Sequence, residues 1–188
     1  MIENGFNKLS WGFLFIVLDF KICGFDIFPD VIGFILFAMA FSQLKEHSQH
    51  FSKASTLNIF TLLLSIFSIY KVQSSNSSII NYGILGSFSI FVGIPYFILT
   101  LLVIYNLLMG MKEMLISNNK NSLAMEADER WTRFITLIIA SILGGLLLFI
   151  PVLGVIYILG LLIFSIVFLV KTMQYFSSCK KSFNGYNY

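Results

Sequence analysis

The sequence predicts an all-α, polytopic transmembrane bundle of about six spans with both termini in the cytoplasm. Three observations predict it: an apolar composition, apolar stretches of spanning length, and basic residues gathered between alternate stretches. Of the 188 residues, 57% are hydrophobic and only 11% are charged, and the mean hydropathy is +0.88. A soluble domain carries about 25% charged residues. Too few polar side chains are present to cover a water-facing surface, so lipid is the expected solvent.

The apolar stretches divide a single membrane domain, residues 1–188, into six segments. We expect the spans at about residues 6–23, 27–47, 55–71, 84–111, 131–149 and 152–173. The first segment is expected to be retained rather than cleaved, because no small-x-small cleavage site follows its apolar run. The cell membrane is therefore the predicted location.

Local signals predict where some of these helices begin. Asp26 is expected to cap the second span, with Pro29 in its first turn, where a missing backbone N–H costs nothing. Ser55 or Thr56 is expected to cap the third span. Residues 112–130, which contain the polar run SNNKNS, are expected to form the largest loop.

The stretch from residue 79 to residue 111 is long enough to allow three arrangements. A helix of that length would measure about 50 Å, against a hydrocarbon core of about 30 Å. In the first arrangement, the N-terminal part of the stretch lies outside the bilayer. In the second, Pro95 kinks one long tilted helix. In the third, the stretch splits at Gly93–Pro95 into two short spans. A single crossing leaves only Lys21 and Lys71 outside, and it places ten of the 12 basic residues in the cytoplasm. Two crossings would leave three inside and nine outside, so the positive-inside rule selects one crossing.

The clearest candidate site is the first hairpin, which holds Asp19, Lys21, Asp26 and Asp30 within twelve residues. An unpaired carboxylate inside a bilayer costs about 2.5–3.5 kcal/mol on insertion scales, so such residues usually face a cavity or a partner. One interpretation is an outward-facing acidic site for a cation, a proton or a cationic ligand. The other is that Asp26 and Asp30 cap a helix while Asp19 and Lys21 lie in interfacial water.

Small residues indicate where helices approach closely. Ala140 and Gly144, and likewise Ser141 and Gly145, are spaced four residues apart in the fifth span. This spacing allows close backbone contact in lipid, either inside one bundle or across a dimer face.

Metal and cofactor chemistry has little support in the sequence. His47 and His50 are three residues apart, but no third ligand is evident, so no metal and no cofactor are predicted. Cys23 and Cys179 are expected on opposite sides of the membrane, which excludes a disulfide between them.

Enzyme activity is not predicted. The sequence contains no Gly-x-Ser-x-Gly motif and no histidine within a later span to act as a base. Glu126, Glu129 and Arg130 lack the paired adjacent glutamates of the intramembrane CAAX-type proteases. No basic stripe with interleaved aromatic residues is present, so nucleic-acid binding is not expected either.

Two function hypotheses remain. The first is a non-enzymatic regulatory or accessory component of a membrane complex, with the lipid bilayer and a membrane-protein partner or a second copy as its partners. The alternative is a transporter of small solutes or ions, or its substrate-binding subunit, using the acidic site. In size, span number and cytoplasmic termini the chain resembles the substrate-capture components of energy-coupling-factor transporters. It departs from them because its first span contains no alanine.

Overall fold

The computed structural model describes residues 2–17, 21–22, 25–26, 30–69, 84–147 and 150–184. Within these ranges lie six α-helices, one 3₁₀ turn and two strands of two residues each. Their bounds are α1 (Ile2–Val17), β1 (Lys21–Ile22), β2 (Phe25–Asp26), α2 (Asp30–Leu44), η1 (Lys45–His47), α3 (Gln49–Ile69), α4 (Ile84–Ser117), α5 (Asn121–Leu147) and α6 (Pro151–Asn184). The prediction of an all-helical bundle is confirmed for the described part of the chain.

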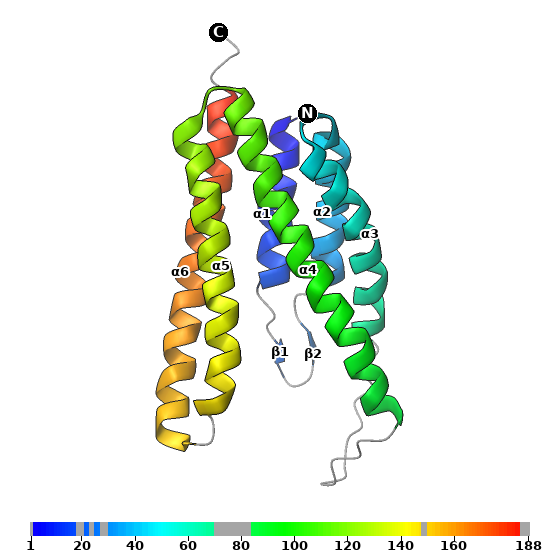
Figure 1. Ribbon diagram of the computed structural model, residues 1–188, viewed down its shortest axis with the longest axis vertical. Helices are drawn as coiled ribbons and strands as arrows, with labels where there is room; N and C mark the ends of the chain where they lie inside the picture. The colour runs from blue at the N-terminus through cyan, green and yellow to red at the C-terminus, as the bar shows by residue number, and fades with distance from the viewer. Residues whose placement is uncertain are drawn as a thin grey trace.

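The six helices form a closed ring with their long axes nearly aligned (Figure 1). Each helix packs against the next one in the sequence, and α6 returns to pack against α1. Toward the lower end of Figure 1 the pair α3–α4 and the pair α5–α6 diverge, and the β1–β2 ladder lies between them.

Both chain termini lie at the same end of the bundle, called here the terminal end (Figure 1). An ion pair of 2.8 Å joins Lys180 Nζ to Glu3 Oε1, and the rings of Phe6 and Phe183 stack at 5.7 Å. The Lys120 ammonium lies 3.7 Å from the centroid of the Phe183 ring, and burial there lowers the pKa of Lys120. The contacts of Glu3 and Phe6 with α6 close the ring between its first and last helices.

The buried core occupies the half of the bundle nearest the terminal end. In α6 the side chains buried against other helices begin at Phe168 and continue to Cys179, whereas between Val152 and Val167 only Gly154 is buried. Phenylalanine dominates the core, and Phe13 contacts the rings of both Phe168 and Phe176. The other half of α5 and α6 therefore exposes apolar side chains over most of its surface.

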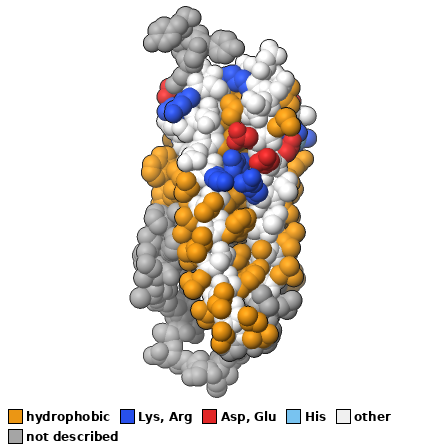
Figure 2. Space-filling model, turned by 90° about the vertical axis from the view of Figure 1, so that its left-hand side faces the viewer, with side chains coloured by type: hydrophobic (Ala, Val, Ile, Leu, Met, Phe, Trp, Pro, Cys, Tyr) orange, Lys and Arg blue, Asp and Glu red, His pale blue; other side chains and the backbone are white. Residues whose placement is uncertain are grey.

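Figure 2 shows this division on one face of the molecule, where acidic and basic side chains gather in the upper part and hydrophobic side chains cover the lower part. Two helical segments within the described residues, Phe91–Ser117 and Val152–Phe183, are long and apolar enough to cross a bilayer. The helices α1 and α2 have 16 and 15 residues, fewer than the about 20 that a span needs. The two long segments support association with a membrane.

Helices α1 and α2 approach each other through two glycines. A Cβ atom placed on Gly33 would lie 2.9 Å from the carbonyl oxygen of Gly12 and 2.6 Å from Ile16 Cγ1. A Cβ atom on Gly12 would meet Phe37 Cδ1 at 2.6 Å. Only glycine at both positions permits this backbone separation.

The cap predicted for the second span is wrong. Asp26 lies in β2, where its Cα pairs with that of Lys21, and α2 begins at Asp30. Proline disfavours the helical conformation in the residue before it, so Pro29 in the sequence limits how early the helix can start. The predicted position of Pro29 itself lies outside the described residues.

The cap predicted for the third span is also wrong, because α3 starts at Gln49, well before Ser55 and Thr56. The backbone N–H of His50 donates to Ser48 Oγ at 3.0 Å, which makes Ser48 the capping residue.

The predicted loop over residues 112–130 is replaced by two helices joined at Asn118–Lys120. The N–H of Lys120 donates to the Leu115 carbonyl at 2.9 Å, and that of Asn119 donates to the Ile116 carbonyl at 3.0 Å. With Asn119 at φ 59°, these bonds form a Schellman motif, in which asparagine tolerates the left-handed conformation. Polar residues in the run SNNKNS thus end one helix and start another.

The ambiguous stretch is helical from residue 84 onward. Helix α4 continues through Pro95 to Ser117, so it does not split at Gly93–Pro95. Residues 79–83 lie outside the described part of the chain.

Candidate functional site

The predicted acidic site is only partly described. Asp19 lies outside the described residues, and the β1–β2 register sets Lys21 opposite Asp26. Asp30, the first residue of α2, accepts a hydrogen bond of 2.6 Å from the Tyr96 hydroxyl on α4. The sequence analysis did not anticipate Tyr96 as a partner, since the two residues are 66 positions apart.

A stripe of polar side chains lies near this pair, on the buried face of α3. Asn58, Thr61 and Ser65 are spaced for one helix face, and each is fully buried. Asn58 Nδ2 donates to the Phe34 carbonyl at 2.9 Å and so joins α3 to α2. Asn58 Oδ1 is buried without a hydrogen-bond partner among the described residues. This stripe places polar groups in an otherwise apolar part of the bundle.

A groove of about 420 Å³ opens between the start of α3 and the last turns of α4, and we call it the α3–α4 groove. Its lining consists of His50, Met109, Lys112, Glu113, Ile116 and Ser117. The Ser48 hydroxyl, which caps α3, donates to Glu113 Oε2 at 2.5 Å. The serine therefore holds one oxygen of the Glu113 carboxylate, and Glu113 lines the groove.

Asn106 determines which nitrogen of His50 carries the proton. Asn106 Nδ2 donates to the Leu102 carbonyl at 2.8 Å, which can only accept, and this fixes the orientation of the amide. The amide oxygen then lies 3.0 Å from His50 Nδ1, so a neutral imidazole donates its Nδ1–H there. The other ring nitrogen, Nε2, is left as an acceptor, and it has no hydrogen-bond partner among the described residues.

Charged and aromatic side chains surround the α3–α4 groove. Lys112 Nζ forms an ion pair of 2.7 Å with Asp128 on α5. The ring of Tyr105 stands edge-on to His50 at 6.2 Å and to Trp131 at 5.1 Å. Tyrosine and tryptophan prefer the interface between lipid and water, so this pair is typical of the headgroup layer.

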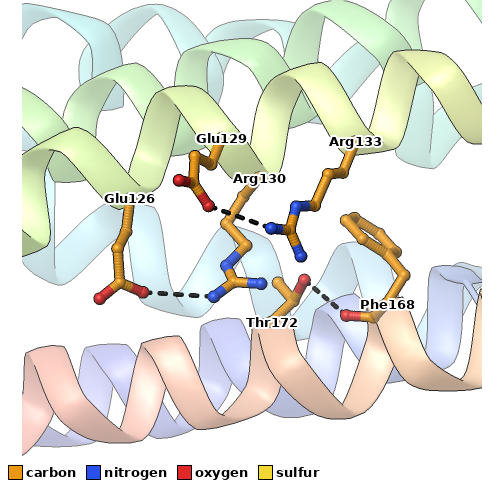
Figure 3. A network of polar contacts seen from close by, with 6 residues as sticks. All are labelled: Glu126, Glu129, Arg130, Arg133, Phe168 and Thr172. Atoms are coloured by element: carbon orange, nitrogen blue, oxygen red, sulfur yellow. Dashed lines mark hydrogen bonds and ion pairs between the residues drawn. The ribbon is translucent and has the colours of Figure 1, made fainter.

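A second group of polar side chains lies where α5 faces α6 (Figure 3). Arg130 Nη2 contacts Glu126 Oε2 at 3.2 Å, and Arg133 pairs with Glu129 at 3.3 Å. The Arg130 side chain points from α5 toward α6 near Thr172 (Figure 3). Its Nε and Nη1 atoms are buried and have no hydrogen-bond partner within the described residues. The sequence shows no protease motif in Glu126, Glu129 and Arg130, and in the structure these residues form i,i+4 ion pairs along α5, with Arg130 buried.

The two histidines near the start of α3, His47 and His50, have different surroundings. His47 is exposed in η1, whereas His50 is half-buried against Asn106. Among the described residues, no group of three or more histidine, cysteine or acidic side chains could hold a metal ion.

The four small residues of α5 face different surroundings. Gly144 packs against the Tyr157 ring of α6, whose hydroxyl donates to the Ala140 carbonyl at 2.8 Å. Ser141 donates to the Leu137 carbonyl of its own helix and is exposed. A Cβ atom added to Gly145 would meet nothing within 4 Å.

These observations define a class: an all-helical protein with two membrane-length apolar helices, a charged terminal end and a polar groove near it. No protein-family model matches the chain, and neither the curated proteins nor the solved structures include a significant match.

Proposed function

We propose that the protein is a six-span integral membrane protein with both termini in the cytoplasm, and that it serves as a non-enzymatic component of a membrane complex. The exposed apolar surface of α4, α5 and α6 supports a lipid environment. The terminal end carries the basic residues Lys8, Lys120, Lys180 and Lys181, as expected for a cytoplasmic face.

The observation that carries the component role is the open small-residue face of α5. Ala140 and Gly144 are used for contact with α6, but Ser141 and Gly145 point away from it. Lipid tails are as apolar as leucine, so helices associate in membranes where small residues permit close packing. An open pair of this kind favours a transmembrane helix of another protein as the partner.

The topology is tested with reporter fusions. A reporter fused after Tyr188 or inserted at Asn119 should be active only as a cytoplasmic reporter, and one inserted between α5 and α6 only as an external reporter. An external signal from the fusion after Tyr188 would contradict the proposed orientation.

The component role is tested by photo-crosslinking in isolated membranes, in a variant whose own cysteines are replaced by serine and whose single introduced cysteine is labelled with a benzophenone maleimide. Gly145→Cys should cross-link to another membrane protein. Leu143→Cys is the matched control, because it is comparably exposed but faces a different side of α5. Equal cross-linking of both variants, or a product consisting of two copies of this chain, would contradict the proposal.

Transport remains the second candidate, favoured by the Asp30–Tyr96 hydrogen bond beside the buried polar stripe on α3. Buried polar side chains from several helices are typical of an ion pathway. In proteoliposomes, Asp30→Asn should abolish cation or proton uptake while protein yield is retained, and Asp19→Asn tests the rest of the acidic site. Uptake that equals that of empty liposomes for the unmodified protein would exclude this function for the cations assayed.

A further inference from the structure

We propose that the α3–α4 groove binds the headgroup of an aminophospholipid, a lipid whose ammonium carries N–H donors, from the cytoplasmic leaflet. This inference rests on the proposed membrane orientation and goes beyond the component role.

Two acceptors in the groove suit an ammonium group. Glu113 contributes a carboxylate, and within the described residues Ser48 engages only its Oε2. His50 contributes Nε2, because Asn106 takes the proton-bearing Nδ1. A primary ammonium has several N–H donors, so it can donate to a carboxylate and to an imidazole nitrogen together.

Buried groups hold both acceptors in place before any ligand arrives. Ser48 is 6% exposed and Asn106 is 7% exposed, and each also bonds to the backbone of its own helix. A preorganised pair of acceptors loses little side-chain entropy on binding.

The remaining lining matches the rest of such a lipid. Lys112 lies next to Glu113 in the groove, and its side chain is 34% exposed despite the ion pair with Asp128, so a phosphate can approach it. Met109 and Ile116 contribute apolar surface beside these charges. An ethanolamine phosphate carries its ammonium and its phosphate a short ethyl link apart, which fits adjacent acidic and basic residues.

The depth of the groove favours a lipid over a soluble amine. His50 contacts the ring of Tyr105, which contacts Trp131, and both aromatic residues are typical of the headgroup layer. At that level the phospholipid headgroup is the most abundant source of ammonium groups. A choline headgroup lacks N–H donors and cannot donate to Glu113 or His50.

The experiment is native mass spectrometry of the full chain, released from nanodiscs that contain equal amounts of phosphatidylethanolamine, phosphatidylcholine and phosphatidylglycerol. We expect phosphatidylethanolamine adducts to exceed phosphatidylcholine adducts by about tenfold, because one charge-assisted hydrogen bond changes the affinity by about this factor. Glu113→Gln and His50→Phe should each reduce this preference. Glu129→Gln is the matched control, because its carboxylate is exposed and pairs with Arg133 away from the groove.

Three results would overturn the inference. Equal binding of the ethanolamine and choline lipids excludes recognition of N–H donors, and an unchanged preference in Glu113→Gln excludes this groove. Displacement of the lipid by soluble phosphoethanolamine at equal concentration assigns the site to a free amine. If the chain instead remains in the soluble fraction without detergent, the proposed membrane function fails together with the lipid site.

Discussion

The contact between Gly12 and Gly33 makes the sharpest prediction about stability. The perturbation is Gly33→Ala, which adds one methyl group where α1 and α2 are closest. That methyl carbon would lie 2.9 Å from the Gly12 carbonyl oxygen and 2.6 Å from Ile16 Cγ1. The side chain of Ile16 can rotate, but the carbonyl belongs to the backbone of a helix, so the two helices must separate.

The magnitude follows from two opposing effects. Overpacking of this kind costs about 1–3 kcal/mol. Alanine in a helix is favoured over glycine by about 1 kcal/mol, which offsets part of the cost. Gly93→Ala isolates the second effect, because Gly93 lies within α4 and a Cβ atom there would meet nothing within 4 Å. The two variants should therefore differ in the free energy of unfolding by about 1–3 kcal/mol.

The assay is thermal unfolding of both variants in the same detergent, followed by the loss of the monodisperse peak in size-exclusion chromatography. Gly93→Ala should unfold at or above the temperature of the unmodified protein, and Gly33→Ala should unfold lower than Gly93→Ala, by an amount on the order of 5 °C. Equal unfolding temperatures for the two variants would show that α1 and α2 do not approach each other as described.

Three further predictions test other parts of the molecule. In the same thermal unfolding assay, Asn119→Gly should stabilise the protein by about 0.5–1 kcal/mol, because the left-handed conformation at φ 59° costs glycine nothing. A lower unfolding temperature for this variant would contradict the Schellman motif. Glu126→Ala should destabilise the protein by about 1 kcal/mol, because Arg130 loses its acidic partner; the 41% exposure of the Glu126 side chain limits the loss. Adding Arg130→Met should recover most of the lost stability. If the double variant is no more stable than the single one, the buried guanidinium is not the cause. In ¹⁵N spectra of labelled histidine, neutral His50 should carry its proton on Nδ1. Asn106→Leu should produce a mixture of the two tautomers. A proton on Nε2 in the unmodified protein would refute the assignment.

Helix α4 shows what local sequence could predict. Its long apolar run predicted a helix, and the basic residues predicted that the chain would not reverse at Pro95, where the helix indeed continues. Composition is informative here because apolar side chains favour lipid, where the polar backbone groups must bond to one another, and a helix pairs them within one segment.

Local sequence predicted the helix ends less well. Ser48 and Asn119 act at the helix boundaries, whereas the local pattern favours Asp26 and Ser55 or Thr56 as caps and predicts a loop around Asn119. Serine, asparagine and aspartate favour caps, turns and strand ends alike, so their presence alone does not identify the position that the backbone will use.

The candidate site was the least predictable part. Ser48 and Glu113 are 65 positions apart, and His50 and Asn106 are 56 apart. Asn106 is an isolated amide side chain in an apolar stretch of the sequence, but no sequence pattern predicts that its partner is His50. When an α-helix is apolar on nearly every side, its hydrophobic pattern does not show which face packs against other helices. The rotation of the helix about its axis therefore cannot be predicted from the local sequence.

The sequence by itself determined that this chain is helical and that it has few polar side chains to form a water-facing surface, because those properties depend on the overall composition. The tertiary structure alone decided that Ala140 and Gly144 contact α6 while Ser141 and Gly145 remain open, and that His50 and Glu113 meet in one groove. Such contacts depend on how the helices rotate and cross. That choice is made by close packing between segments distant in the sequence, where a single methyl group at Gly12 or Gly33 would exclude the observed arrangement.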